Sequence, residues 1–173
     1  EEAMNAIHYF KSQNIETTMI TGDAKLTGEA VGRLVGVDQV FANVLPEEKS
    51  AIVDQLKREV GMTGMVGDGI NDAPALVNAD IGVAMGDGTD IAIDVADVVV
   101  MKNDLSKLGY AHRVSKRLNK IVQQNIIFSM LVVATLIILN FLGIANIAFS
   151  VLIHEGSTLV VIFNGLRLLV NTK

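Results

Sequence analysis

The hydrophobic positions follow two different patterns, and the change falls near residue 113. Before it, short apolar runs rich in β-branched residues alternate with stretches whose apolar residues recur every three or four positions. The first pattern is typical of buried strands and the second of amphipathic helices. Strands are predicted within residues 15–20, 37–41, 62–66, 81–84 and 98–101, and helices within residues 26–35, from Pro46 onward and from Asn71 onward.

This alternation of strands and helices predicts an α/β fold with a doubly wound parallel sheet. Ligands of such sheets bind beyond the carboxyl ends of the strands. Two polar strings, Thr21-Gly22-Asp23 and Gly67-Asp68-Gly69, follow directly after predicted strands. We therefore expect both strings at the ligand-binding edge.

After residue 113 the chain becomes a long apolar segment. Residues 121–153 contain no charged side chain over 33 positions, whereas one membrane-spanning helix needs about 20 apolar residues. Asn140, Gly143 and Asn146 indicate a turn inside this segment. Two transmembrane helices are predicted, at about residues 126–142 and 147–170. An amphipathic linker helix around residues 104–125 is predicted to join them to the α/β part. The alternative is a helical hairpin in a soluble core, where helices rarely stay uncharged over such a length.

The net charge of −5 combines two parts of opposite sign. Residues 1–112 hold 8 Lys and Arg against 18 Asp and Glu, whereas residues 113–173 hold 6 against 1. Basic residues precede the first predicted span, and Arg167 and Lys173 lie at the end of the second. The positive-inside rule then places both ends, and residues 1–112, in the cytoplasm of a cell whose membrane the chain crosses twice.

The composition excludes several classes of protein. The absence of cysteine excludes a disulfide framework and a Cys-based zinc finger. An acidic balance with 5% aromatic residues argues against a nucleic-acid partner, and 50% hydrophobic residues argue against disorder. The chain begins at Glu1 without an initiator Met, and we expect it to belong to a longer protein.

The most informative polar string is Gly67-Asp68-Gly69-Ile70-Asn71-Asp72. Mg²⁺ prefers carboxylates, water and phosphate oxygens. Asp68 and Asp72 can face one ion across a strand-to-helix turn, while Asn71 donates to a phosphate. The alternative is a turn capped by its own Asx side chains.

Two further features suit a phosphate. The hydroxyl and backbone N–H groups of Thr21-Gly22-Asp23 suit a phosphoryl oxygen, and Lys49, on the helix that Pro46 opens, can neutralise phosphate charge. Taken singly, the first is equally explained as a helix N-cap, and a lone lysine is more often a solvated surface charge.

His154 and Glu155 lie inside the second predicted span, where ionisable residues are costly and indicate function. Imidazole suits Zn²⁺, Co²⁺, Cu²⁺ and Ni²⁺, and carboxylate suits harder or borderline ions. Ser157 and Thr158 share a helix face with His154, whereas Glu155 points about 100° further round. Hydrogen bonding to a neighbouring helix is the alternative role for this pair.

The ordered strings Thr21-Gly22-Asp23, Pro46-Glu47-Glu48-Lys49 and Gly67 to Leu76 resemble the phosphorylation domain of P-type ATPases, which are ion pumps of the haloacid dehalogenase superfamily. The resemblance implies that residues 1–112 are part of such a domain and that ATP and Mg²⁺ are its cofactors. The implied roles are contact with the phosphoryl group for Thr21 and Lys49, completion of the first motif by Gly22 and Asp23, a place near the phosphate for Asn71, and Mg²⁺ binding for Asp68 and Asp72.

The string from His154 to Thr158, followed by Asn164-Gly165-Leu166-Arg167, looks like the last membrane helix of heavy-metal-transporting P-type ATPases of the cobalt and zinc type. This implies ATP-driven export of a divalent metal ion. The implied partners are that ion, the lipid bilayer and the remaining domains of the same pump. Residues His154, Glu155, Ser157 and Thr158 are the implied ligands of the transported ion.

One departure from the family matters. The Asp-Lys-Thr-Gly-Thr string that carries the phosphorylated Asp is absent. We therefore expect that this chain alone forms no aspartyl phosphate and that its sheet is incomplete. The alternative functions are a membrane-anchored haloacid dehalogenase-type phosphatase and a non-catalytic metal-binding or regulatory fragment.

Overall fold

The computed structural model describes residues 2–101 and 104–170, so Glu1 and Lys173, which figure in the sequence analysis, lie outside the described residues. The chain divides into two compact units, Glu1–Gly109 and Tyr110–Lys173. The first holds all five strands and the shorter helices, and the second holds most of the two long helices.

Every predicted strand is present, with bounds that differ from the prediction by up to three residues. The five are β1 (Thr18–Ile20), β2 (Gln39–Phe41), β3 (Gly64–Gly67), β4 (Ile81–Met85) and β5 (Val98–Val100). All three strand pairs are parallel, but they form two separate sheets, β1-β2 and β3-β4-β5. The parallel strands are therefore divided between a two-stranded and a three-stranded sheet.

The helices between the strands begin and end where the side chains favour it. Helix α3 (Pro46–Val60) has proline in its first turn, and the Glu48 carboxylate accepts a hydrogen bond from the Leu45 amide at 2.9 Å. Helix α2 (Lys25–Val35) ends at Gly36 with a positive φ. The predicted short helix is a 3-10 turn η1 (Ile70–Asp72) followed by α4 (Ala73–Asn78).

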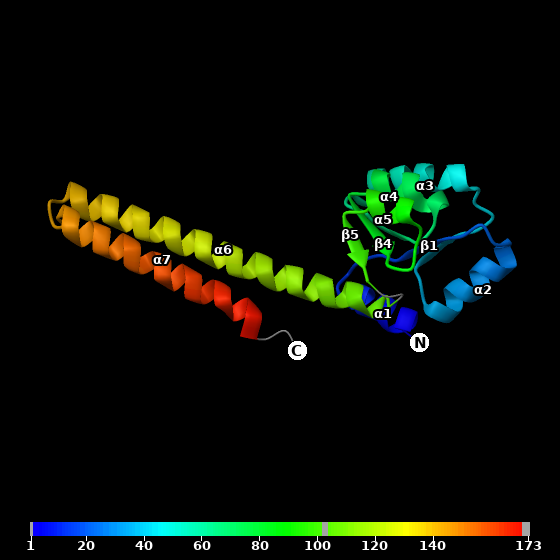
Figure 1. Ribbon diagram of the computed structural model, residues 1–173, viewed down its shortest axis with the longest axis horizontal. Coiled ribbons are helices and arrows are strands. Elements are labelled where there is room, and N and C mark those ends of the chain that lie inside the picture. Colours follow the sequence, from blue (N-terminus) through cyan, green and yellow to red (C-terminus); the bar gives the residue numbers. More distant parts are fainter. Residues whose placement is uncertain (1, 102–103, 171–173) are drawn as a thin grey trace. The chain divides into compact units, whose positions relative to one another are not determined.

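Two helices of the first unit were not predicted from the sequence, α1 (Glu2–Ser12) and α5 (Asp90–Val95). Figure 1 shows α3 and α4 on one side of the strands and α1 and α2 on the other. Helices therefore cover both faces, as a doubly wound fold requires.

The core of the first unit is centred on β4, whose successive side chains point to opposite faces. Ala84 packs against Leu76 of α4 and Ala92 of α5. Val83 and Met85 pack on the other face, with Val100 of β5. A strand between two parallel neighbours is buried on both faces, which explains why this run lacks polar alternation.

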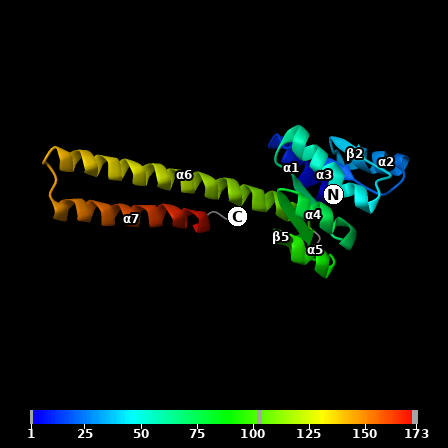
Figure 2. The same ribbon diagram turned by 90° about the horizontal axis from the view of Figure 1, so that it is seen from above.

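In the second unit the predicted linker and first span are one helix, α6 (Ser106–Phe141), and α7 (Ile147–Val170) follows. Both are long and apolar enough to cross a membrane, and only 11% and 0% of their most apolar windows are buried. This exposure is unlike a helical hairpin in a soluble core. Figure 2 shows α6 and α7 running side by side.

At the amino end of each parallel strand pair, one aspartate hydrogen-bonds a residue of the neighbouring segment through both its own N–H and its carboxylate. We call this arrangement an aspartate bracket. Asp38, Asp80 and Asp97 each come directly before a strand, and each donates its own N–H to the carbonyl of a residue on the neighbouring strand or just before it. The carboxylate then accepts the N–H of the same residue, at 2.9 Å from Thr17, 2.8 Å from Thr63 and 2.8 Å from Gly82.

Two of these brackets also carry a lysine. Lys11 lies 2.7 Å from Asp38, and Lys57 lies 3.2 Å from Asp80. Hydrogen bonding to Lys11, and then to the Thr17 amide and hydroxyl, lowers the pKa of Asp38 to about 2. The Thr63 amide, followed by Lys57, likewise lowers the pKa of Asp80.

The first prediction concerns acid stability. The folded pKa of Asp38 lies below its ordinary 3.8, so its stabilising contribution is present above that value and is lost as the pH falls toward about 2. We expect Asp38→Asn to lower the melting temperature at pH 7, and the difference from wild type to shrink between about pH 4 and pH 2. Thermal unfolding followed by circular dichroism measures this.

The matched control is Asp54→Asn. Asp54 is exposed on α3 and has no ion pair or side-chain hydrogen bond to any residue within the described ranges. Its variant should melt like the wild type throughout this pH range. If the difference in melting temperature between Asp38→Asn and wild type stayed constant with pH, the stabilising role assigned to the ionised Asp38 carboxylate would be wrong.

Candidate functional site

The loop after β3 is organised around one buried carboxylate. Asp72, in η1, is 8% exposed. Its Oδ2 atom accepts the backbone N–H groups of Asp68 at 3.4 Å and Gly69 at 3.3 Å. Its Oδ1 atom lies 2.6 Å from Nζ of Lys49. Both oxygens of Asp72 are therefore engaged, one by the loop backbone and one by a cation.

Lys49 reaches this loop from the first turn of α3. Its side chain is 18% exposed and that of Asp72 is 11% exposed, so the ion pair is largely withdrawn from water. Removing one partner of a buried pair leaves an uncompensated charge and costs about 3–5 kcal/mol. The pair therefore ties α3 to the loop after β3.

Asp68 differs from Asp72 in its exposure and in its partners. It is exposed, and its carboxylate makes no hydrogen bond or ion pair with any residue that the structure describes. The nearby Asn71 side chain is also exposed and likewise has no partner among those residues. A carboxylate and an amide therefore face outward from a loop whose shape the buried Asp72 maintains.

A third loop supports this one and was not singled out from the sequence. The Thr89 amide donates to the Asp68 carbonyl at 2.9 Å, and a Cβ at Gly88 would lie 2.6 Å from the same oxygen. The sequence carried a pattern that could have identified this loop, because Gly86-Asp87-Gly88 follows a predicted strand just as Gly67-Asp68-Gly69 does.

The other string, Thr21-Gly22-Asp23, lies directly after β1, in the other sheet. The Thr21 hydroxyl donates to the Asp23 carboxylate at 2.8 Å and accepts the Asp23 amide at 3.1 Å. A phosphoryl oxygen would have to take the place of Asp23 as the acceptor of this hydroxyl proton. The geometry is that of a small side-chain turn at the end of a strand.

A short backbone segment joins this string to α3. The Asn43 amide donates to the Asp23 carbonyl at 2.8 Å, and the Val44 amide donates to the Thr21 carbonyl at 3.1 Å. Val44 is buried, and α3 with Lys49 begins two residues later. The structure therefore brings Lys49, Asp72 and the Asp68 loop into direct contact, and residues 43–49 connect Thr21 to them.

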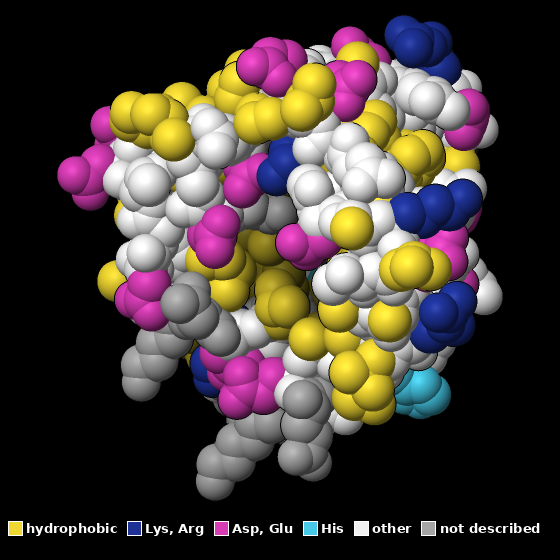
Figure 3. All heavy atoms as spheres, turned by 90° about the vertical axis from the view of Figure 1, so that its right-hand side faces the viewer, with side chains coloured by type: hydrophobic (Ala, Val, Ile, Leu, Met, Phe, Trp, Pro, Cys, Tyr) yellow, Lys and Arg dark blue, Asp and Glu magenta, His cyan; other side chains and the backbone are white. Residues whose placement is uncertain are grey.

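The first unit offers donors for Mg²⁺, but not a complete ligand set. No cluster of three or more His, Cys, Asp or Glu side chains suited to a metal occurs among the described residues. Mg²⁺ is commonly held by one or two carboxylates together with water and substrate phosphates. The exposed Asp68 carboxylate fits that mode, and Asp72 fits as the group that holds the loop. Figure 3 shows acidic side chains lying among hydrophobic ones on the face of the molecule that it presents.

The second unit carries the other candidate site, on α7. The Ser157 and Thr158 hydroxyls both donate to the His154 backbone carbonyl, at 2.7 and 3.2 Å. They are therefore drawn toward the helix backbone, while their lone pairs stay available. Glu155 is exposed and lies about 100° further round the helix, so the four residues do not converge on one point.

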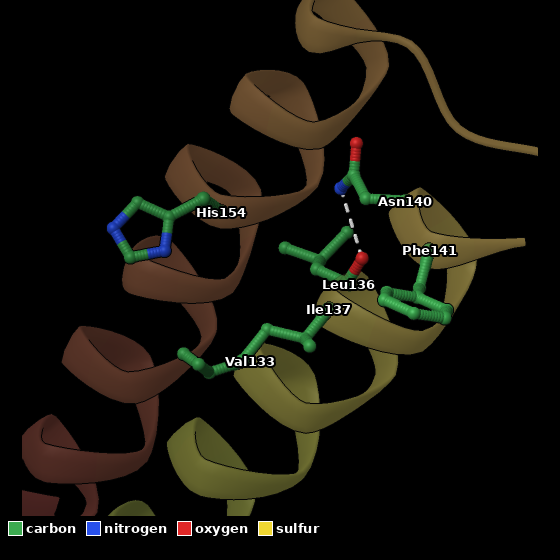
Figure 4. Close-up of a pocket in the computed structure, with 6 residues that line it drawn as sticks. All are labelled: Val133, Leu136, Ile137, Asn140, Phe141 and His154. Carbon is green, nitrogen blue, oxygen red and sulfur yellow. Dashed lines mark hydrogen bonds between the residues drawn. The ribbon is translucent and has the colours of Figure 1, made fainter. Parts of the chain in front are cut away.

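His154 borders an open groove of about 640 Å³ in this unit. The other lining residues belong to α6 and are Val133, Leu136, Ile137, Asn140 and Phe141. Figure 4 shows the imidazole projecting from the flank of α7. The Asn140 amide donates to the Leu136 carbonyl at 2.8 Å and to the Ser150 hydroxyl at 2.9 Å. The groove is lined mainly by apolar side chains, and Asn140 and His154 are its polar lining residues.

Comparison with known proteins covers both units. A family profile of haloacid dehalogenase-like hydrolases matches residues 1–80. The chain is 49% identical over 168 residues to the zinc-transporting ATPase of Bacillus subtilis strain 168, covering 97% of this chain and 26% of that protein. It is 44% identical to the cadmium, zinc and cobalt-transporting ATPase of the same strain, covering 98% and 25%.

A solved structure gives the same result. The crystal structure of a zinc-transporting PIB-type ATPase in its E2.Pi state matches 95% of this chain and 27% of that chain, with a TM-score of 0.90 and 33% identity. The chain spans about a quarter of the length of the curated relatives it matches.

The second prediction tests the close packing of the Asp72 loop. A Cβ at Gly67 would lie 2.6 Å from Cβ of Asp72, so Gly67→Ala must displace the buried carboxylate. We expect a loss of about 1–3 kcal/mol in the free energy of unfolding. Gly64→Ala in the same strand is the matched control, because its Cβ would meet its nearest neighbour at 3.7 Å. Equal melting temperatures for the two variants would contradict this packing.

Proposed function

Because this chain belongs to the heavy-metal-transporting P-type ATPases, we propose that it serves an ATP-driven exporter of a divalent metal ion of the Zn²⁺ or Co²⁺ type. Residues 1–112 would supply the second part of the cytoplasmic phosphorylation domain. Residues 113–173 would supply a linker helix and two transmembrane helices. The phosphorylated Asp would come from outside this chain.

One observation carries the proposal, namely that the similarity runs through both units. A relationship to haloacid dehalogenase-type phosphatases would explain the first unit alone. The transporting relatives instead match 97% and 98% of the chain, the apolar helices included. We therefore infer that the residues suited to phosphoryl transfer and the histidine on an apolar helix serve one transport protein. Ion transport driven by phosphorylation requires both.

In the phosphoryl half, we assign separate tasks to the residues of the two loops. Asp68 would hold Mg²⁺, which when bound offsets the negative charge of the phosphoryl oxygens. Asp72 would keep the Asp68 loop in place through the two amides and Lys49. Asn71 would donate its amide protons to a phosphoryl oxygen.

At the other loop, the Thr21 hydroxyl would turn from Asp23 to a phosphoryl oxygen, with Gly22 permitting close approach of the backbone. Lys49 would add its charge from α3 while remaining near Asp72. A cation near the phosphoryl group stabilises charge that develops during transfer.

In the membrane half, the transported ion is the substrate. His154 would bind it through the imidazole that borders the groove. Ser157 and Thr158 would add oxygen ligands through lone pairs left free by their bonds to the backbone. Glu155 would face a different helix of the pump. An isolated imidazole is a weak site, so ligands from other helices of the same pump would complete it.

The third prediction tests whether Asp68 serves phosphorylation and not the binding of the transported metal. In the full-length pump, Asp68→Asn should slow phosphoenzyme formation from ATP roughly a hundredfold or more, because the amide cannot replace a charged Mg²⁺ ligand. Binding of the transported metal should remain within about twofold of wild type. Labelling with radioactive ATP and equilibrium metal binding measure the two quantities.

Asp54→Asn, on the exposed face of α3, serves as the control and should phosphorylate like the wild type. If Asp68→Asn also phosphorylated normally, the assignment of Asp68 to Mg²⁺ would be wrong.

The fourth prediction concerns the cargo. His154→Ala should reduce stimulation of ATP hydrolysis by Zn²⁺ and Co²⁺ at least about tenfold, because the imidazole is lost, and should leave the Mg²⁺ dependence of phosphorylation unchanged. His8→Ala, at an exposed position of α1, is the matched control. Normal metal stimulation in the His154 variant would overturn the transport-site assignment.

A further inference from the structure

The two apolar helices are joined by a group of polar contacts near the carboxyl end of α7. The Asn164 amide donates to the Asn125 side-chain oxygen at 2.8 Å, and the Asn125 amide points to the Val161 carbonyl at 3.4 Å. Asn164 also approaches Gln124 at 3.4 Å. Asn125 and Asn164 are both partly shielded from solvent, so their bonds lie between the helices.

Two arginines extend this group toward the end of α7. Arg167 donates to the Asn164 oxygen at 2.8 Å, which holds that amide in the orientation that serves Asn125. Arg117 of α6 donates to the Arg167 backbone carbonyl at 2.8 Å. A guanidinium at the last carbonyls of a helix is favoured by the helix dipole.

Arg117 and Asn125 are eight residues apart, so they lie on the same face of α6 about 12 Å apart along its axis. They contact Val161, Asn164 and Arg167, which follow one stripe along the last turns of α7. Asn140 and Ser150 form a further polar contact between the two helices, beside the turn.

From these contacts we propose that Asn125 and Asn164 form an interhelical lock that makes α7 follow displacements of α6. Both are positioning residues: they would act on the transported ion through the placement of His154, which lies about 15 Å from Asn164 along α7. This inference rests on the proposed transport function.

The physical reason is the cost of breaking these bonds near a bilayer. A carboxamide that loses its partner inside an apolar interface loses a hydrogen bond that lipid cannot replace. Sliding α7 along α6 by one residue would separate the pair by about 1.5 Å and break the 2.8 Å contact. The apolar middle of the hairpin constrains this register less sharply, because contacts between aliphatic side chains are not directional.

The fifth prediction tests the lock in the full-length pump reconstituted into liposomes. The readouts are Zn²⁺ transported per ATP hydrolysed and phosphoenzyme formed from ATP. Asn125→Ala and Asn164→Ala should each lower the transport ratio roughly three- to twentyfold, with phosphoenzyme formation retained. The double variant should lose no more than either single variant, because one deletion already breaks the contact.

Asn119→Ala is the matched control, since Asn119 is exposed on α6 and contacts no described residue of α7. Its transport ratio should equal that of wild type. Unchanged ratios in the Asn125 and Asn164 variants, or losses that multiply in the double variant, would overturn the lock. A wild-type pump without metal-stimulated hydrolysis would overturn the proposed function itself.

If the alanine variants fail to accumulate in membranes, cysteines at positions 125 and 164 provide a second measurement. A disulfide between them should form readily and leave the transport ratio unchanged, because the contact is proposed to persist through the cycle. Failure to form the cross-link, or loss of transport once it forms, would show that the helices separate there and would overturn the inference.

Discussion

The ion pair between Lys49 and Asp72 is the contact on which the arrangement of the first unit depends. Asp72 is the buried charged residue among those described, and its charge is tolerated because a lysine and two amides surround it. The same carboxylate fixes the turn that presents Asp68. Asp72 therefore serves both stability and chemistry, because it makes the loop rigid and in doing so presents a second carboxylate. That second carboxylate, Asp68, is the one free to bind a ligand.

Two populations of carboxylates follow from the direction of the strands. Asp38, Asp80 and Asp97 lie at the amino ends, where each accepts an amide of the neighbouring segment and fixes the pairing. Asp68 lies beyond a carboxyl end, where no strand amide points toward it. Parallel strands place all their carboxyl ends at one edge. At that edge Asp72 is engaged by Lys49 and the loop amides, and Asp68 is the carboxylate left available beside it.

The sequence predicted most of the secondary structure because local signals decide it. Pro46 and Glu48 define the start of α3, and β-branched runs define the strands. The sequence did not predict α5, because six residues carry too little periodicity. It also did not predict the pairing of Lys49 with Asp72, because that contact depends on how α3 packs against α4. The linker and the first span were predicted as separate segments, but no proline interrupts residues 106–141 and their one glycine, Gly109, lies in the first turns, so the helix continues.

The membrane unit shows the same division between fixed and available polar groups. Asn125 and Asn164 pair with each other between the helices, and the Asn125 amide also reaches the Val161 carbonyl, which spares these amides an unpaired state in an apolar interface. His154 lies on the flank of α7, where its imidazole borders a groove, and Glu155 lies further round. A hairpin whose interface amides are paired internally leaves its ionisable residues facing outward. Under the proposed function, the hairpin would therefore supply one wall of the site for the transported ion, and other helices of the pump would supply the rest.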